Sequence, residues 1–311
     1  MIQQFIKKLK YKGELGYYFA KMLTSLNRYK NGNYLNDKDY ISKRFLNSHD
    51  YPMNWDNPQS LNEKLQVLKW QYNKDLHATV SDKYAARQFI MERFGEEYLI
   101  PLVFETKNPI EITDKVVPDF PVIVKANHDA GNNFIIRDKK TVDWKKLQTD
   151  CRWWLSWNYY YTDREQQYKN IDRRIIVEKL LTTKDGKIPN DYKLNYINGN
   201  LEFVYVSLDR ECGNFRNIYD IDWNPLEFKW AKKYKLKKTK RGHEISPPPT
   251  WELMKSMSAE IAKLFPCVRV DFYDVDGKLY FGEITLCHGG GFDCFEPKDM
   301  DFHFGSKLIL H

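Results

Sequence analysis

The stretch Val268-Arg269-Val270-Asp271-Phe272-Tyr273 is followed, after an Asp276-Gly277 turn, by Phe281-Gly282-Glu283-Ile284-Thr285. Alternating apolar residues on both sides of an Asp-Gly pair predict a β-hairpin. Asp271 and Glu283 each lie six positions from Gly277, so a loop centred on that glycine would place the two carboxylates opposite each other. A two-residue turn would instead shift the pairing by one position. Two facing carboxylates beside Arg269 suggest a magnesium-phosphate site, and an ordinary hairpin with solvated charges is the alternative.

A second unit lies upstream. Residues 120–125 form an apolar run that ends at Lys125, a polar loop containing Gly131 follows, and Phe134 to Arg137 resume a strand pattern. Such a loop can turn backbone N–H groups toward phosphate oxygens, while a lysine at a strand end supplies a point charge. A surface hairpin is the alternative reading.

Two further segments could complete a nucleotide site. The apolar run 174–181 carries Glu178, and its backbone could flank a purine. Asp191-Tyr192-Lys193 then opens a hairpin around Asn198-Gly199, a strong turn signal. Lys193 is a candidate second phosphate contact, although lysine and glutamate at strand ends are often only solvated.

Taken in order, these segments resemble the ATP-grasp superfamily. The resemblance implies an α+β fold in which two α+β subdomains grip a nucleotide, here preceded by a helical N-terminal segment. One departure is Thr285, which stands where the family usually has asparagine. The residues that carry the resemblance are Ser81-Asp82-Lys83, Lys125 with its glycine loop, Glu178, Arg269-Val270-Asp271 and Glu283-Ile284-Thr285.

A narrower resemblance covers most of the chain and is to the TupA-like branch, which is associated with bacterial surface polysaccharide and teichuronopeptide synthesis. It rests on residues 57–65, 82–87 and 95–102, together with Asp191-Tyr192-Lys193 and residues 281–285.

The resemblance implies an ATP- and Mg²⁺-dependent ligase that joins a carboxylate to an amine through an acylphosphate. The carboxylate would be a uronic acid or similar group on a sugar or glycan, and the amine would be free or part of an amino acid. By resemblance, Arg269 and Lys193 are catalytic; Lys83, Lys125, Gly131, Glu178, Asp191 and Lys193 bind the nucleotide; and Asp271, Glu283 and Thr285 hold the metal.

Two other enzyme classes stay open. A kinase of a sugar hydroxyl could use the same nucleotide site, with Asp129, His128 or His288 as the general base. A metal-dependent glycosyltransferase could use the D-x-D patterns at 220–222 and 274–276.

Charge and cysteine content narrow the setting. The net charge is +7, and residues 229–241 alone hold eight basic residues and no acidic one. No nucleic-acid recognition module is visible, so we expect this segment to be solvated or to grip an anionic substrate or lipid headgroup. Five cysteines without metal or disulfide spacing, and no apolar run of transmembrane length, favour a cytoplasmic protein.

We expect four segments: a basic helical segment 1–55, a mostly helical segment 56–118, a lysine-bearing nucleotide subdomain 119–180 and a metal-binding subdomain 181–311. The apolar spacing in the first segment predicts amphipathic helices, which could pack on the protein or contact the inner face of a membrane. The aromatic insert at 153–161 could stack on sugar rings or form helix core. The Gly289-Gly290-Gly291 run could approach the acylphosphate or simply be a flexible connection.

Overall fold

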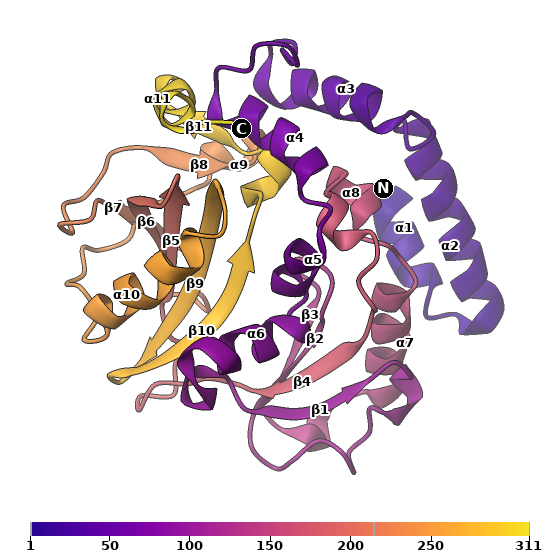
Figure 1. Ribbon diagram of the computed structural model, residues 1–311. Coiled ribbons are helices and arrows are strands. Elements are labelled where there is room, and N and C mark those ends of the chain that lie inside the picture. Colours follow the sequence, from indigo (N-terminus) through magenta and orange to yellow (C-terminus); the bar gives the residue numbers. More distant parts are fainter. Residues whose placement is uncertain (1, 214, 311) are drawn as a thin grey trace.

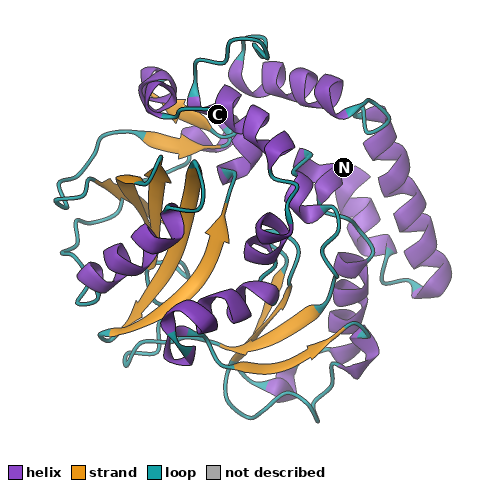
Figure 2. Ribbon diagram, viewed as in Figure 1, coloured by secondary structure: helices purple, strands orange, loops and turns teal. Residues whose placement is uncertain are grey.

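The computed structural model describes residues 2–213 and 215–310, and it confirms the α+β class with a helical N-terminal segment (Figures 1 and 2). Helices α3 (Asp37–His49) and α4 (Leu61–Gln71) begin just after residues whose side chains cap a helix N-terminus. Ser60 and Glu63 form a reciprocal capping box, and the Asn36 side chain accepts from the backbone N–H of Asp39. The first helices are α1 (Ile2–Leu9), α2 (Gly13–Lys30), α3 (Asp37–His49), α4 (Leu61–Gln71), α5 (Asp75–Ser81) and α6 (Ala85–Phe94).

The first sheet is antiparallel with strand order β1-β4-β2-β3. Its strands are β1 (Leu102–Thr106), β2 (Val122–Ala126), β3 (Asn133–Ile136) and β4 (Ile175–Lys179). Side chains alternate along β2: Val122 and Val124 are buried in the core that helix α7 (Trp144–Leu155) helps to form, so Lys125 points to the opposite face. One face of this sheet is therefore core, and the other is free to line a cleft.

The second sheet is also antiparallel, with strand order β10-β9-β5-β6-β7. Helix α10 (Trp251–Ala262) packs on one face, where Met254 and Ile261 share a core with Leu194 and Val270. The Asn198-Gly199 turn predicted from sequence joins β5 to β6, with positive φ at both residues. The strands are β5 (Asp191–Ile197), β6 (Asn200–Leu208), β7 (Phe215–Tyr219), β9 (Cys267–Val275) and β10 (Lys278–Thr285).

Short elements complete the chain. Strands β8 (Lys229–Ala231) and β11 (Cys294–Glu296) form a two-stranded sheet. The remaining helices are α8 (Tyr160–Asp163), α9 (Lys233–Leu236) and α11 (Asp299–Lys307), and the 3-10 turns are η1 (Glu96–Tyr98), η2 (Pro109–Glu111), η3 (Lys139–Thr141), η4 (Gln166–Tyr168) and η5 (His288–Gly291). Within the described residues, no helix combines the length and apolar character needed to cross a bilayer.

The two larger sheets lie on different sides of α5 and α6 in Figure 1. The four-stranded sheet draws β1 from the segment 56–118 and the other three strands from 119–180. The aromatic insert packs within the protein: Trp153 meets Tyr17 edge to face with ring centroids 5.5 Å apart, and Trp157 lies under Arg28. These rings therefore join the N-terminal helices to the first sheet.

Candidate active site

In the β9–β10 hairpin, Glu283 faces Asp271 as predicted, but the turn that joins the two strands differs from the predicted loop. Val275 pairs with Lys278, so the turn is the two-residue Asp276-Gly277 turn, with φ values of 53° and 87°, and not a loop centred on Gly277. Such a turn alone would displace Glu283 by one position. A β-bulge between Phe281 and Glu283 adds one residue to β10 and restores the match, so that Glu283 faces Asp271.

The bulge falls at Gly282. A Cβ atom added there would lie 3.0 Å from the carbonyl oxygen of Asp271, closer than most real contacts. Glycine thus allows the two strands to approach where the two carboxylates must face each other.

Arg269 joins the two carboxylates. Its guanidinium donates two bonds to Asp271, at 2.6 and 2.7 Å, and a third to Glu283 at 2.8 Å. Burial would lower the pKa of Arg269, but the negative charges of Asp271 and Glu283 raise it, so the guanidinium stays charged.

Lys193 adds a second cation from the neighbouring strand. It lies opposite Asp271 in the β5–β9 register, and its Nζ contacts Asp271 at 2.5 Å and Asp191 at 2.6 Å. Arg210, just beyond β6, approaches Asp191 at 4.0 Å. The cleft face of the second sheet therefore alternates positive and negative groups.

Lys83 links the two sheets. Its Nζ donates to the carbonyl oxygen of Asp129 in the β2–β3 loop at 2.5 Å and lies 3.8 Å from Glu283. Burial would raise the pKa of Glu283, but Lys83, Arg269 and Lys193 outweigh it and hold that pKa at about 2. Glu283 is therefore an anion at neutral pH.

Lys125 and Glu178 lie on the cleft face of the first sheet. Lys125 Nζ is 2.5 Å from Glu178, whose other oxygen is 3.1 Å from Arg87 on α6. Gly131 lies in the β2–β3 loop with φ of 90° and open space where a Cβ would be. Thr285 lies opposite Arg269, with its hydroxyl 3.4 Å from Glu283.

A cavity of about 110 Å³ lies between the two sheets. The first sheet lines it with Lys125 and Glu178, and the segment after β4 adds Leu180. The side of the second sheet contributes Tyr273 on β9 and Arg210 just beyond β6. The structure therefore brings together residues of both predicted subdomains.

The residues present fit a Mg²⁺ site completed by a substrate. Within residues 2–213 and 215–310, no three His, Cys, Asp or Glu side chains converge as a ready-made metal site. Mg²⁺ is commonly held by one or two carboxylates together with substrate phosphates and water. Asp271 and Glu283 supply two such carboxylates, and Arg269, Lys193 and Lys83 supply positive charge for the phosphates.

The glycine run forms the tight turn η5 and is not a flexible connection. A Cβ on Gly290 would lie 2.5 Å from Asp163, and one on Gly291 would lie 2.3 Å from Gln66. This packing fixes His288, whose Nδ1 accepts from Arg269 at 2.8 Å and whose ring stacks on Trp230 at 3.9 Å.

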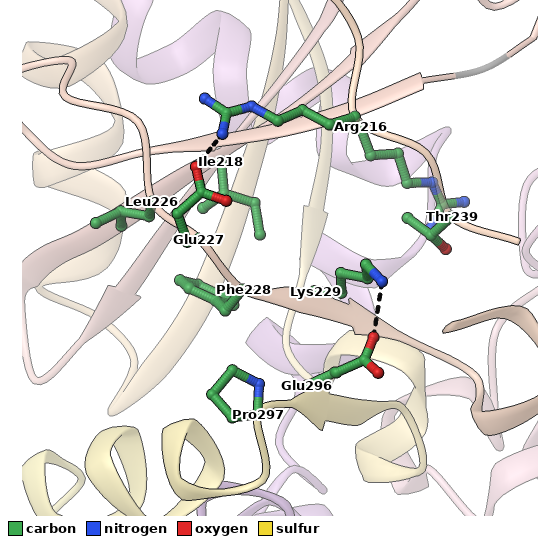
Figure 3. A pocket seen from close by; sticks show the side chains of 10 residues that line it. Arg216, Ile218, Leu226, Glu227, Phe228, Lys229, Thr239, Glu296 and Pro297 are labelled. Atoms are coloured by element: carbon green, nitrogen blue, oxygen red, sulfur yellow. Dashed lines mark hydrogen bonds and ion pairs between the residues drawn. The ribbon is translucent and has the colours of Figure 1, made fainter. Parts of the chain in front are cut away.

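A second cavity, of about 340 Å³, lies at the β7 edge of the second sheet (Figure 3). Arg216 and part of the basic segment 229–241 line it. Several of these cations are paired: Lys229 with Glu296 at 2.8 Å, and Arg241 with Glu227 and Glu244. The basic segment is thus partly neutralised and lines a hollow at the β7 edge of the sheet that carries the candidate site.

The D-x-D patterns serve turns. Asp220 accepts from the backbone N–H groups of Asp222 and Asn224, and Asp274 accepts from those of Thr250 and Gly277. Asp129 and His128 are also engaged: Asp129 accepts from Asn132, and burial raises its pKa to about 6, while burial lowers the pKa of His128 to about 4.

Comparison with known protein families shows to which family this chain belongs. The sequence model described as TupA-like ATPgrasp matches residues 63–309. The chain belongs to the TupA-like ATP-grasp family. No curated protein matches this TupA-like chain.

Solved ATP-grasp structures resemble it distantly. D-alanine–D-alanine ligase from Bacillus anthracis complexed with ATP is 15% identical with a TM-score of 0.39, and the match covers 68% of this chain and 56% of that one. The ATP-grasp ligase PsnB complexed with its minimal precursor is 14% identical with a TM-score of 0.38, and the match covers 72% of this chain and 59% of that one. The ADP complex of PurK, N5-carboxyaminoimidazole ribonucleotide synthetase, is 12% identical with a TM-score of 0.38, and the match covers 72% of this chain and 50% of that one. The TupA-like chain thus spans little more than half the length of these proteins.

Sequence reasoning missed three cleft residues of this TupA-like protein. Tyr273 could have been found, because it lies two positions after Asp271 on the same strand face. Arg87 and Arg210 give no such signal, since their partners Glu178 and Asp191 are distant in sequence or on another strand.

Proposed function

We propose that this protein is an ATP- and Mg²⁺-dependent ligase that joins a carboxylate to an amine through an acylphosphate. The observation that carries the proposal is the pair Asp271–Glu283 facing Lys193, Arg269 and Lys83. The pair lies on the sheet whose Tyr273, two positions after Asp271, lines the inter-sheet cavity. Family membership supports the proposal.

The charge balance of the cleft suits a nucleotide triphosphate. Six cations contact its four carboxylates, Asp191, Glu178, Asp271 and Glu283, and so leave an excess of positive charge; the cations are Lys83, Arg87, Lys125, Lys193, Arg210 and Arg269. Phosphoryl transfer depends mainly on positioning and on neutralising charge. We therefore assign Lys83, Lys125, Gly131, Glu178, Asp191 and Lys193 to the nucleotide, and Arg269 and Lys193 to catalysis.

Asp271 and Glu283, with Thr285 as a third candidate, would hold the magnesium. When bound, the ion would supply positive charge that neutralises the charge developing on the phosphate oxygens. Thr285 is the residue that departs from the family pattern, and its hydroxyl points toward Glu283 at 3.4 Å, so it can still face a shared cation.

The reaction has two steps. A carboxylate oxygen of the substrate attacks the γ-phosphorus, the bond to the β–γ bridging oxygen breaks, and ADP leaves. The amine then attacks the acyl carbon, inorganic phosphate leaves with the electron pair of the C–O bond, and the amine loses a proton. Arg269 and Lys193 would stabilise the charge that shifts among the phosphate oxygens.

We propose that the carboxylate belongs to a uronic acid or similar acidic sugar used in bacterial surface polysaccharide synthesis. The cavity at the β7 edge supports this choice, because apolar Phe228 and Leu226 lie there beside Arg216 and paired charges (Figure 3). Aromatic and apolar surface suits the apolar face of a pyranose, and arginine suits its carboxylate. Use of ATP favours a cytoplasmic location.

The decisive experiment uses an acidic sugar with ¹⁸O in its carboxylate, together with an amine, ATP and Mg²⁺. A ligase transfers one ¹⁸O to inorganic phosphate, which mass spectrometry detects alongside ADP and the amide. A kinase would leave the phosphate on the sugar product, and a glycosyltransferase would release no ADP from ATP. ADP with unlabelled inorganic phosphate would contradict the acylphosphate route.

A further inference from the structure

Helix α2 presents a continuous apolar stripe to solvent. Its members recur at helical spacing and therefore share one face about 100° wide. The exposed fractions are Leu15 89%, Tyr18 57%, Phe19 46%, Met22 48%, Leu26 51% and Tyr29 61%. Single exposed apolar residues are ordinary, but a stripe along four turns indicates a binding surface.

The opposite face of α2 already accounts for its packing within the protein. Gly16, Tyr17 and Ala20 are buried, and the Tyr17 hydroxyl donates to the carbonyl oxygen of Arg152 on α7. Arg28 lies over the Trp157 ring at 4.2 Å. Helix α2 thus has two apolar faces, of which the inner one is buried. The outer one stays largely exposed, although the Tyr18 hydroxyl accepts from Arg152 at 3.2 Å and the Tyr29 ring packs against Tyr34. Helix α2 forms the outer rim of the molecule in Figure 1.

The segment that carries this stripe is strongly basic. Residues 1–36 contain seven basic residues and one acidic residue, a net charge of +6 against +7 for the whole chain. The single acid, Glu14, is paired with Arg152 at 2.5 Å. Among the basic residues, Lys7, Lys8, Lys12 and Lys30 are exposed.

We propose that α1 and α2 bind the surface of an anionic phospholipid bilayer, with the α2 stripe inserted among the headgroups. Tyrosine and phenylalanine suit the interface, and the lysines attract anionic lipid. A second copy of the chain is a poorer occupant, because two surfaces that each carry +6 would repel each other. The inference rests on this surface alone and is independent of the proposed ligase activity.

The test is flotation of the full chain with vesicles of phosphatidylcholine alone or mixed with phosphatidylglycerol. We expect the protein to float with the mixed vesicles only, and to be released by high salt. The triple variant Leu15→Glu/Met22→Glu/Leu26→Glu should stay in the soluble fraction. Its matched control, Ile110→Glu, changes a 72% exposed residue far along the chain and should float like the wild type.

The lysines give a second, graded test. Because one basic residue near an anionic surface is worth roughly a fivefold gain in partitioning, Lys7→Gln/Lys8→Gln/Lys12→Gln should weaken binding by roughly a hundredfold. The control Lys115→Gln/Lys140→Gln/Lys145→Gln removes the same charge from exposed sites elsewhere and should change it far less.

Three outcomes would overturn the proposal: no flotation of the wild type with mixed vesicles, equal flotation of the stripe variant, or a concentration-dependent dimer that the stripe variant dissolves. The last would show that a second copy covers the stripe. Circular dichroism and thermal melting of the same variants show whether each is folded. If the triple variant unfolds, the single substitutions Met22→Glu and Leu26→Glu decide the test, and flotation of both equal to that of the wild type would overturn the proposal.

Discussion

The carboxylate of Glu283 lies among three cations and opposite Asp271, at the point where the β-bulge turns it toward the cleft. Replacing Glu283 with glutamine keeps the shape but removes the charge. We expect kcat for Mg²⁺-dependent turnover to fall by about 100-fold or more, while the fold is retained at neutral pH. Glu260→Gln, on the exposed face of α10, is the control; full activity of Glu283→Gln would refute the metal assignment.

The same residue predicts a pH dependence of stability. The pKa of Glu283 is about 2 in the folded protein, below the ordinary value of 4.5. A lowered carboxyl pKa stabilises the fold at pH values above 4.5, and this contribution is lost as the pH falls toward about 2. Thermal melts of wild type and Glu283→Gln across that range should converge at the acid end. A constant difference between them would contradict the assignment.

Lys125 lies on the first sheet, on the opposite side of the inter-sheet cavity from Tyr273. Lys125→Ala should weaken ATP binding, because it removes a cation that lines the inter-sheet cavity. It also leaves Glu178 with Arg87 as its remaining partner, so some loss of stability is expected. Isothermal titration with ATP and Mg²⁺ gives the affinity, and exposed Lys145→Ala on α7 is the control. Unchanged nucleotide affinity would assign Lys125 a structural role only.

Single residues also show how far sequence could predict the site. Asp271, Glu283, Lys193 and Lys83 do converge, because strand alternation and hairpin register are local rules. The predicted loop centred on Gly277 was wrong, because the bulge at Gly282 that restores the register has no reliable local signal. The pairing of Arg87 with Glu178 spans 91 positions and depends on tertiary packing alone.

At the level of elements, the β9–β10 hairpin depends on the fit of Gly282. Gly282→Val should lower the free energy of unfolding by about 1–3 kcal/mol, because its side chain would crowd the Asp271 carbonyl. It should lower Mg²⁺-dependent turnover more strongly, since Glu283 would leave its place opposite Asp271. Calorimetry and kinetics on Gly282→Ala and Gly282→Val should show an effect that grows with side-chain size. If Gly282→Ala and Gly282→Val were equally active, the result would contradict the role of the bulge in setting the strand register.

Strand content was largely predictable, whereas sheet order was not. The hairpin around Asn198-Gly199 appears where the sequence predicts it. The pairing of β1 with β4 joins segments some 70 positions apart, and alternation along either strand cannot reveal its partner. The aromatic insert was ambiguous for the same reason, because its partners are the N-terminal helices.

Over the whole molecule, nucleotide should bind to both sheets at once. A ligand that binds only the folded state at 100 times its dissociation constant adds about 2.7 kcal/mol to stability. We expect ATP with Mg²⁺ to raise the melting temperature and to slow hydrogen exchange both at residues 127–132 and along β9–β10. UDP-sugars provide the comparison. Protection confined to one sheet, or stabilisation by a UDP-sugar alone, would contradict a nucleotide held between the two.

The contact between Lys193 and Asp271 joins positions 78 residues apart, across strands that belong to one sheet. Such long-range contacts form late in folding, because the intervening chain must first give up its freedom to close the loop. The charged cluster cannot exist on a nascent chain that has not yet reached Glu283, because that residue lies on β10 (Lys278–Thr285). Recovery of turnover after dilution from denaturant would therefore follow the slowest folding phase, and a partly synthesised chain would consume no ATP.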